Sequence, residues 1–236
     1  MRNFIPHIDA LGDLTSVLEF ARTHTKELGV IRQSYHFSPI FDEPTSLRTV
    51  VHADGFDPEW IELYEQSDFR SQDPIPGRTM QAGKMLSWAD AIAMEINTAE
   101  QEQYFSAMRK HGLEHGFGLP LYGPRGRSAY ASFDFGKPLN EVDSGDLAEI
   151  RVLARATHHR LCNIIDEIRS NPELSEREKE VIGWIVKGKS TRDIGTILDL
   201  SPDTVKTYTQ RVYHKLGVHD RIGATIRVLK LGLVQV

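Results

Sequence analysis

The sequence predicts two domains of different fold class, which makes the whole chain α+β. Before residue 144 both strand-like and helical hydrophobic periods occur, residues 144–168 carry one long helical stripe, and three helix-start signals follow from residue 175 onwards. With 236 residues the chain is long enough for one domain of ordinary size and one small domain. We therefore expect an N-terminal domain of mixed structure and an all-helical C-terminal domain of four helices.

Hydrophobic periodicity predicts the elements of the N-terminal domain in order. Helical patterns occupy residues 14–28, 58–66 and 98–111, and strand-like runs occupy residues 30–37 and 47–53. Two further strands, at 116–122 and 128–135, flank a turn from Gly123 to Gly126 and so indicate a hairpin. An antiparallel sheet with helices packed on both faces, an α/β/α sandwich, would bury these apolar stripes.

One long helix is expected to close the N-terminal domain. Its apolar residues recur at three- and four-residue steps between Leu147 and Ile168. A dimer contact and packing against the sheet of its own domain explain this stripe equally well. A polar segment with an Asn-Pro step follows, so we expect a first domain at 1–168, a linker at 169–173 and a second domain at 174–236.

The composition excludes several classes of protein. Cys162 is the only cysteine, which rules out an intramolecular disulfide and argues against a zinc site built on cysteine. The first residues lack the apolar core of a signal peptide, and no stretch reaches the roughly 18 apolar residues of a membrane span. We therefore expect a cytoplasmic protein without membrane contact.

The charge differs in sign between the two parts of the chain. The net charge is -5, but residues 171–236 hold 11 Lys and Arg against 8 Asp and Glu, so residues 1–170 carry -8. This distribution suggests that only the C-terminal domain meets a polyanion, although charge alone fits an ordinary solvated surface equally well.

Helix-capping signals divide the C-terminal domain. Ser175 with Glu178, and Ser190 with Asp193, have the spacing of capping boxes, in which each side chain satisfies a free backbone N–H group of the first helical turn. A third helix is expected to begin at Ser201 and to end at a left-handed Gly217, with Pro202 at its first position, and a fourth helix spans about 220–232.

The third of these helices has the pattern of a DNA-reading helix. Val205, Val212 and Leu216 are expected to face inward, while the other faces carry Asp203, Lys206, Thr207, Gln210, Arg211 and His214. Such a helix fits the major groove of DNA, where its Lys, Arg, Gln and Thr side chains can reach base edges or phosphates. From spacing alone, a small helical bundle with a polar surface remains an alternative.

Residues 173–234 resemble the C-terminal domain of LuxR-type regulators in the order and spacing of their motifs. The matching residues are Leu174, Ser175, Glu178, Val181, Gly188, Lys189, Ser190, Ile194, Leu200, Ser201, Thr204, Val205, Lys206, Lys215, Leu216, Gly217 and Val218. The resemblance implies a homodimer that reads an inverted repeat in double-stranded DNA, with the last helices packed against each other. Candidate DNA contacts are Lys189, Thr204, Lys206, Thr207, Gln210 and Arg211.

The N-terminal domain contains aromatic residues suited to a pocket for an amphiphile. Trp60 and Tyr64 are four residues apart, hence on one face of a helix, and each combines an apolar body with a polar tip. With Asp73, Trp88 and Gly116 they resemble, over roughly residues 10–165, the acyl-homoserine lactone-binding domain found in LuxR-type quorum-sensing regulators.

This second resemblance implies a role for each pocket residue. Trp60 would donate to the lactone carbonyl, Asp73 would accept the amide N–H of the ligand, Tyr64 and Ser132 would hydrogen-bond its acyl carbonyl, and Trp88 would form a wall beside the lactone. Gly116 would allow close backbone approach at a strand.

Three departures from the family pattern affect the expected ligand. Phe56 stands where the family usually has a tyrosine hydroxyl, Ile75 follows Asp73 by two residues, and Gly118 replaces a residue that is often polar. A more apolar pocket is therefore expected, one that prefers a long-chain or unusual lactone or a related non-lactone signal.

No constellation of residues predicts an enzyme. His111 and His115 are four residues apart, but glycines interrupt any helix there, while His158 and His159 are adjacent and cannot share a helical face. A Gly-x-Ser-x-Gly nucleophile motif is absent. We expect no catalysis, no metal and no cofactor. The alternative to a lactone-responsive regulator is an orphan member of the same family that responds to a non-lactone signal, to a protein partner or to no ligand.

Overall fold

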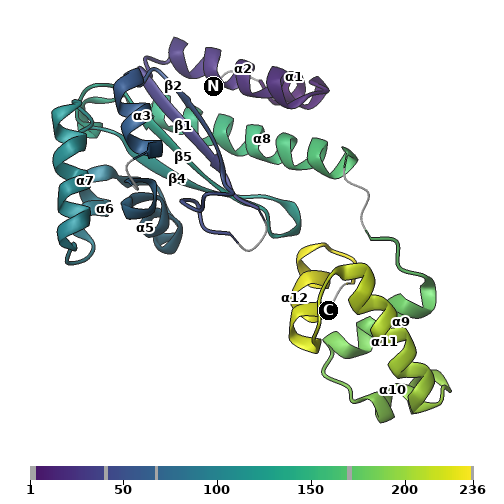
Figure 1. The fold of residues 1–236 in the computed structure, drawn as a ribbon. Helices are drawn as coiled ribbons and strands as arrows, with labels where there is room; N and C mark the ends of the chain where they lie inside the picture. Colours follow the sequence, from purple (N-terminus) through teal and green to yellow (C-terminus); the bar gives the residue numbers. More distant parts are fainter. Residues whose placement is uncertain (1–3, 40–41, 67–68, 169–171, 235–236) are drawn as a thin grey trace. The chain divides into compact units, whose positions relative to one another are not determined.

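The computed structural model of the chain describes residues 4–39, 42–66, 69–168 and 172–234 (Figure 1). The chain divides into two compact units, Met1–Ile164 and Ile165–Val236. Most of the linker expected at 169–173 lies outside the described residues, since 169–171 are among those not described.

The first unit is built on one antiparallel sheet of five strands in the order β2-β1-β5-β4-β3. The strands are β1 (Arg32–Phe37), β2 (Val50–Asp54), β3 (Leu86–Ser87), β4 (Phe117–Tyr122) and β5 (Ser128–Asp134). The hairpin expected from the sequence is confirmed as β4 and β5. β1 pairs with β5 in a register that places Ser34 opposite Ser132 and His36 opposite Tyr130. Side chains therefore alternate between two faces of the sheet.

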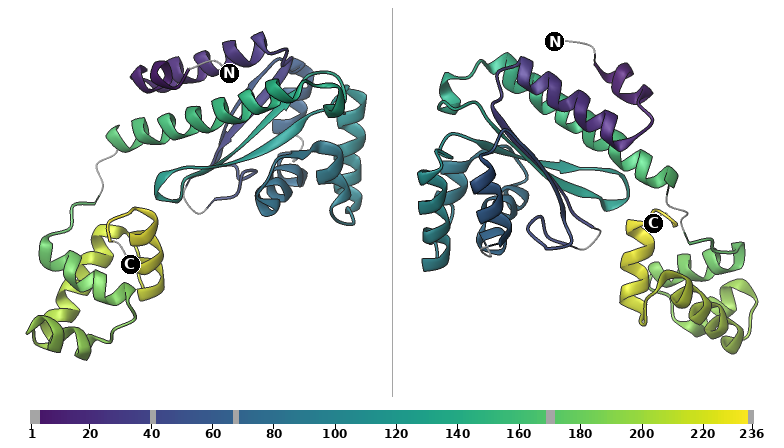
Figure 2. Two further views of the ribbon diagram at one scale, coloured as in Figure 1. Left: turned by 180° about the vertical axis from the view of Figure 1, so that it is seen from behind. Right: turned by 45° about the horizontal axis from the view of Figure 1, so that its top comes forward.

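Helices cover both faces of the sheet, which confirms the α/β/α sandwich (Figures 1 and 2). On one face lie α2 (Leu14–Glu27) and α8 (Ser144–Ile168), with α1 (Ile5–Ala10) beside them. On the other face lie α3 (Pro58–Gln66), α4 (Phe69–Gln72), α5 (Ile75–Ala82), α6 (Trp88–Ala93) and α7 (Ala99–Lys110). The periodicity of the sequence predicted the long helices but not α1, α4, α5, α6 or β3, which are too short to show a clear period.

The apolar stripe of α8 packs within its own unit. Ile150 and Ala154 join the core against β4 and β5, while Leu161 and Ile164 pack with Val17 of α2. Intramolecular burial therefore accounts for the stripe between Leu147 and Ile164 without a dimer contact. Among the described helices, none combines the length and the apolar character that a bilayer span requires.

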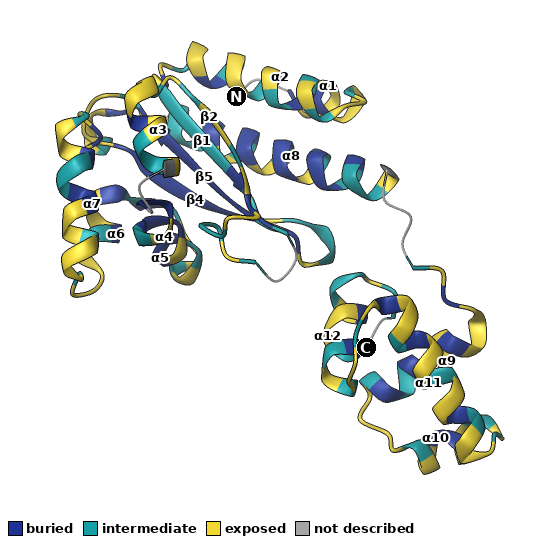
Figure 3. Cartoon of the chain, in the orientation of Figure 1, coloured by how far each residue is buried: buried dark blue, intermediate teal, exposed yellow. Residues whose placement is uncertain are grey.

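The second unit consists of α9 (Glu176–Val186), α10 (Thr191–Leu198), α11 (Pro202–Leu216) and α12 (Arg221–Lys230). Both capping boxes are present, and the hydroxyl of Ser201 caps α11 as the sequence predicted. Gly217 ends α11 with a φ of 63°, in the left-handed region that glycine adopts at no steric cost. Figure 3 shows buried positions on the inner faces of these helices, and the core includes Val205, Val212 and Leu216.

Candidate functional site

A cavity of about 290 Å³ lies in the first unit, between the sheet and the layer of α3 to α7. The side chains that the sequence placed in a ligand pocket all line it: Phe56, Trp60, Tyr64, Asp73, Trp88 and Ser132. The rest of the lining comes from the strands and helices around them: Ser34, His36, Val51, Ala53, Ile61, Glu65, Ile75, Tyr104, Met108, Leu113 and Tyr130. A mostly apolar lining with a few convergent polar groups suits a small amphiphile.

Asp73 is the ionisable group at the centre of the polar set. It is only 8% exposed, and it lies between α4 and α5. Tyr64 donates from its hydroxyl to Oδ2 at 3.1 Å, and the backbone N–H of Ile75 donates to Oδ1 at 3.0 Å. Burial raises the pKa of Asp73 to about 6, although hydrogen bonds from Ile75, Tyr64 and Tyr104 act in the opposite direction. Near neutral pH the carboxylate is therefore ionised at a cost.

Aromatic rings enclose this carboxylate on the helical side of the cavity. The ring of Trp60 lies 6.0 Å from that of Tyr64, 5.9 Å from that of Tyr104 and 5.4 Å from that of His111, measured between centroids. Burial raises the pKa of Tyr104 well above its ordinary value, so its hydroxyl stays neutral. Tyr104 is a pocket residue that sequence reasoning missed, because on α7 it reads as one more apolar position of an amphipathic helix.

Two glycines on β4 and just before it make room for aromatic side chains of the pocket. A Cβ atom at Gly116 would lie 2.3 Å from Cζ2 of Trp88, which confirms the expectation of a close backbone approach there. A Cβ atom at Gly118 would lie 2.4 Å from Cε2 of Tyr130. Gly118 therefore does not simply remove a polar group from the pocket, since it provides the space that the Tyr130 ring occupies.

The sheet side of the cavity carries three hydrogen-bonded polar side chains, of which the sequence predicted Ser132 but not Ser34 or His36. The Oγ atoms of Ser132 and Ser34 are 2.7 Å apart, and Ser34 Oγ is 3.1 Å from Nε2 of His36. Nδ1 of His36 lies 3.3 Å from the carbonyl oxygen of Pro44. His36 is buried, and burial lowers its pKa to about 4, so the imidazole is neutral. The two-residue period of β1 was the available signal, because it places Ser34 and His36 on one face.

The departures expected to make the pocket more apolar are partly offset. Phe56 is half-buried and packs against the aromatic cluster without a hydroxyl, as its residue type requires. Ile75 is buried, yet its backbone N–H is one of the donors to Asp73. Tyr104 supplies a hydroxyl beside the same carboxylate. The surroundings of Asp73 are thus polar in spite of Phe56.

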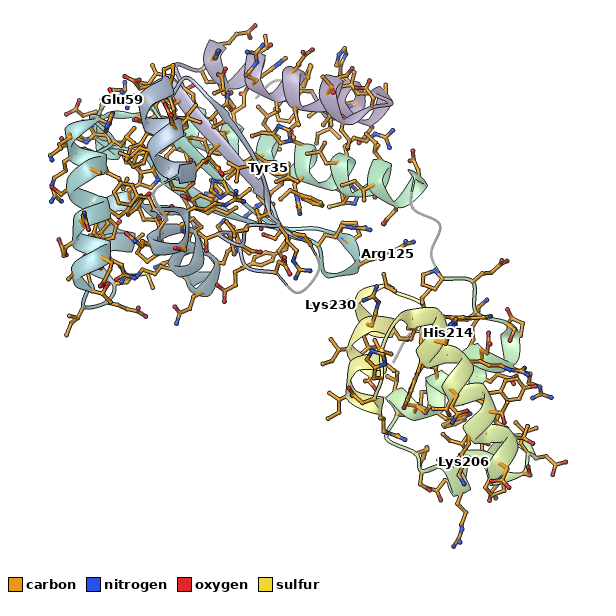
Figure 4. All side chains as sticks on the ribbon, in the orientation of Figure 1. Tyr35, Glu59, Arg125, Lys206, His214 and Lys230 are labelled. Carbon is orange, nitrogen blue, oxygen red and sulfur yellow. The ribbon has the colours of Figure 1, made fainter. Side chains whose placement is uncertain are left out.

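In the second unit, α11 presents a polar face suited to a polyanion. Lys206 has 65% of its side chain exposed and pairs with Asp203 at 3.2 Å, and Figure 4 shows it extending from α11 away from its unit. Thr207, Gln210 and Arg211 are also exposed and line one concave surface with His214 and Lys215. Lys206, Thr207, Gln210 and Arg211 are therefore all accessible.

The remaining two candidate DNA contacts differ from each other. Lys189 is exposed in the turn before α10, and its carbonyl oxygen accepts a hydrogen bond from Arg221. Thr204 is half-buried, and its hydroxyl lies 2.8 Å from that of Ser201 at the start of α11. The Thr204 side chain therefore takes part in the cap at the N-terminal end of α11.

Comparison with known proteins assigns both units. Residues 13–161 match the autoinducer binding domain, and residues 172–228 match the family of bacterial regulatory proteins called the luxR family. The chain belongs to the LuxR family. It combines the autoinducer-binding domain and the luxR-family DNA-binding domain, as in the LuxR-family transcriptional regulators of quorum sensing.

Individual relatives and solved structures agree with this assignment. The LuxR-family chain is 29% identical over 178 residues to the protein y4qH of Sinorhizobium fredii, covering 75% of this chain but only about half, 54%, of y4qH. It is 26% identical over 183 residues to the quorum sensing-dependent regulator RpaR of Rhodopseudomonas palustris, covering 78% and 74% of the two chains. The crystal structure of Escherichia coli SdiA matches with a TM-score of 0.74 at 24% identity, over 98% of this chain and 96% of SdiA, which shows a shared fold.

A second cavity of about 320 Å³ lies on the opposite face of the sheet, against α2 and α8. Its lining includes Leu18, Phe133 and Leu153, and none of the described pocket residues that the LuxR resemblance singled out. Thr157 of α8 lines it, is 4% exposed, and has no hydrogen-bond partner for its hydroxyl among the described residues.

Proposed function

We propose that the chain is a quorum-sensing regulator that binds an N-acyl-homoserine lactone in the cavity around Asp73. The same proposal makes it a cytoplasmic homodimer that binds an inverted-repeat site in DNA. It divides the chain into a sensor domain at 1–168 and a DNA-binding domain at 174–236. The observation that carries the proposal is the buried Asp73 carboxylate, which lines an apolar cavity that is large enough for a small amphiphile.

The arrangement around Asp73 suits a secondary amide. A carboxylate has about four acceptor positions, and the hydroxyls of Tyr64 and Tyr104 and the N–H of Ile75 use three of them. An amide N–H from a ligand would occupy the fourth and would favour the ionised form, whose burial is otherwise costly. Trp60 provides an indole N–H as a donor for a lactone carbonyl, and the Trp88 ring provides a flat wall.

A bound ligand would also complete the core of the first unit. The aromatic cluster around Trp60 and Tyr104 encloses the cavity, so an apolar chain within it would gain contacts with side chains that otherwise border empty space. A ligand that binds only the folded chain raises its stability and shifts the population toward the DNA-competent state.

The second unit supports the DNA-binding and dimer parts of the proposal. Lys206, Thr207, Gln210 and Arg211 would contact bases or phosphates, with Lys189 and Thr204 at the edge of the interface. On α12 a stripe of apolar side chains is exposed, formed by Ile222 (71%), Ile226 (42%) and Leu229 (42%). Positions three and four residues apart lie on one helix face, which suits packing against the same helix of a second copy.

The test of ligand binding is the thermal unfolding midpoint of the full chain with acyl-homoserine lactones of graded chain length. The proposal expects a rise that depends on chain length, and it expects Asp73→Asn to abolish that rise. Thr157→Val, placed on the second cavity, is the matched control and should respond to the lactones like the wild type. A flat response of the folded wild-type protein across the whole panel would refute lactone binding.

A non-lactone amphiphile is a second candidate ligand. SdiA, which shares the fold, has been solved in complex with octanoyl-rac-glycerol, with a TM-score of 0.73 at 22% identity, over 98% of this chain and 93% of SdiA. Including this compound in the same panel separates the candidates. A response to it, with none to the lactones, would favour an orphan regulator with a different signal.

The test of dimerisation is the sedimentation behaviour of Ile226→Asp. A charge in the centre of the α12 stripe should convert dimer to monomer and weaken binding to an inverted repeat, while a single half-site should be bound as before. A variant that remains dimeric would place the dimer contact elsewhere.

A further inference from the structure

The hydrogen bonds that link Ser132, Ser34 and His36 on the sheet side of the cavity all run the same way from donor to acceptor. Their direction follows from the last acceptor, the carbonyl oxygen of Pro44. The carbonyl oxygen of Pro44 can only accept a hydrogen bond, and it faces Nδ1 of His36 at 3.3 Å. Nδ1 must therefore carry the proton of the neutral imidazole, because two acceptors would otherwise face each other. His36 is 4% exposed, and burial lowers its pKa to about 4, so the ring does not gain a second proton near neutral pH. Nε2 is then left with a lone pair and can only accept.

The position of the proton on His36 determines which group is the donor in the hydrogen bonds between His36 and the cavity wall. Ser34 has a single hydroxyl proton, and Nε2 of His36 at 3.1 Å is the acceptor that requires it. The contact of 2.7 Å between the two serine Oγ atoms then leaves Ser132 as the donor to Ser34. Ser132 lines the cavity, and its only proton is committed to Ser34. Ser132 also hydrogen-bonds to the hydroxyl of Tyr130, which must be the donor because the Ser132 proton is used, so Ser132 presents to a ligand one remaining lone pair and no proton.

We propose that this wall selects a ligand with a hydroxyl group on its chain beside Ser132 over one with a ketone at the same place. The inference rests on the proposed function, in which an acyl-homoserine lactone occupies this cavity with its amide at Asp73. A hydroxyl donates to Ser132, whereas a ketone oxygen would set two acceptors against each other at a side chain that is only 3% exposed. Ser34 and His36 act as positioning residues, because they determine where the Ser132 proton points.

The direction of these hydrogen bonds gives Ser132 a different role from the one that the family resemblance implies. A donor to the acyl carbonyl of the ligand needs a free proton, and the chain through Ser34 takes that proton away. Tyr64 lies beside Asp73 on the helical side and takes no part in this chain. Ser132 therefore discriminates between substituents on the acyl chain of the ligand and does not donate a hydrogen bond to its acyl carbonyl.

The experiment compares three decanoyl-homoserine lactones, unsubstituted, 3-oxo and 3-hydroxy, for binding to the full chain by calorimetry. The 3-hydroxy compound should bind about tenfold more tightly than the 3-oxo compound. The reason is that the first forms a hydrogen bond with Ser132, whereas the second places its oxygen against another acceptor. Ser34→Ala releases the Ser132 proton, so this preference should disappear or reverse. Ser38→Ala is the control, since Ser38 is buried and its Oγ accepts a hydrogen bond from the hydroxyl of Thr49, but it does not line the cavity.

A second variant covers the case in which Ser34→Ala fails to fold. His36→Phe keeps an aromatic ring facing Tyr130, which lies 5.2 Å away, and removes the Nε2 acceptor, so it should also lower the preference for 3-hydroxy. In the wild type, the ¹⁵N shifts of labelled histidine should show Nδ1 of His36 protonated and Nε2 unprotonated.

The outcomes separate the inference from the proposed function. Binding of all three lactones with equal or tighter binding of the 3-oxo compound overturns the inference and leaves lactone binding standing. A 3-hydroxy preference that survives unchanged in both variants shows that the Ser34 and His36 chain is not its cause, and a protonated Nε2 does the same. Binding of none of the three overturns the proposed function and the inference with it.

Discussion

Replacing Asp73 by asparagine should stabilise the unliganded protein at neutral pH and remove part of its pH dependence. Burial raises the pKa of Asp73 from 3.8 to about 6 in the folded state. A raised pKa means that ionisation costs more in the folded chain than in the unfolded chain. The stability that Asp73 contributes is therefore fully present below about pH 4 and is lost as the pH rises through about 6.

The size of the effect follows from the same two pKa values. At about 1.4 kcal/mol for each pKa unit, ionised Asp73 destabilises the folded chain by about 3 kcal/mol above pH 7. Asparagine has the shape of the protonated carboxyl group and carries no charge. The free energy of unfolding of Asp73→Asn should thus match the wild type near pH 4 and exceed it by about 3 kcal/mol at pH 7.5.

Urea denaturation of both proteins between pH 4.5 and 7.5 is the assay. A gap between variant and wild type that stays constant over this range would refute the reasoning, since the gap must open as Asp73 ionises. Thr157→Val, which changes no ionisable group, is the control, and its difference from the wild type should not change with pH. Lactone affinity of the wild type should rise with pH through about 6, because the amide N–H binds the ionised form.

Three other substitutions test separate parts of the structure. Gly116→Ala would place a Cβ atom 2.3 Å from Cζ2 of Trp88 and should lower the free energy of unfolding by about 1–3 kcal/mol in urea, with loss of the lactone response. Lys206→Ala should weaken DNA binding and reduce the slope of log affinity against log salt by about 1 in a titration by fluorescence anisotropy. Thr157→Val removes a buried hydroxyl that has no partner among the described residues, and should raise the free energy of unfolding by about 1 kcal/mol.

Each of these three substitutions has either a control variant in the same protein or an outcome that would contradict the prediction. Gly77 lies within α5 with open space at its Cβ position, so Gly77→Ala should stabilise by about 0.5–1 kcal/mol where Gly116→Ala destabilises. Lys179 pairs with Glu176 on α9, and Lys179→Ala should leave the salt dependence unchanged if α9 lies outside the DNA interface. A stability loss in Thr157→Val would show that an ordered water or ligand satisfies the hydroxyl.

Much of the second unit follows from residues close together in sequence. The capping hydroxyls of Ser175, Ser190 and Ser201 each bond a backbone N–H three residues onward, so residue type and spacing suffice to place the helix starts. The inward positions of α11 follow from the helical period in the same way. The exposed donors of this helix are then left on its other faces.

Among the pocket residues, some could be predicted from residues close to them in sequence and others could not. Trp60 and Tyr64 share a helix, so their common face was predictable from spacing. Asp73 came from its match to a family pattern, and its chemistry could not be read from its neighbours in sequence. Tyr104 carried no local signal of a pocket role, because an aromatic residue on an amphipathic helix is an ordinary core residue. The two-residue period of β1 placed His36 on the same face as Ser34 but could not tell it from an ordinary core histidine.

By itself the sequence determined the order of the long helices and strands, the caps of the second unit and the family to which the chain belongs, because local periodicity and motif spacing carry that information. Only the tertiary structure decided the chemistry of the pocket. It joins Ser34 to Ser132 across two strands, and it aims His36 at the carbonyl of Pro44. It also buries Asp73 deeply enough to raise its pKa. Desolvation and the direction of a hydrogen-bond chain depend on groups that are distant in sequence, and these meet only when the sheet and its helices have assembled.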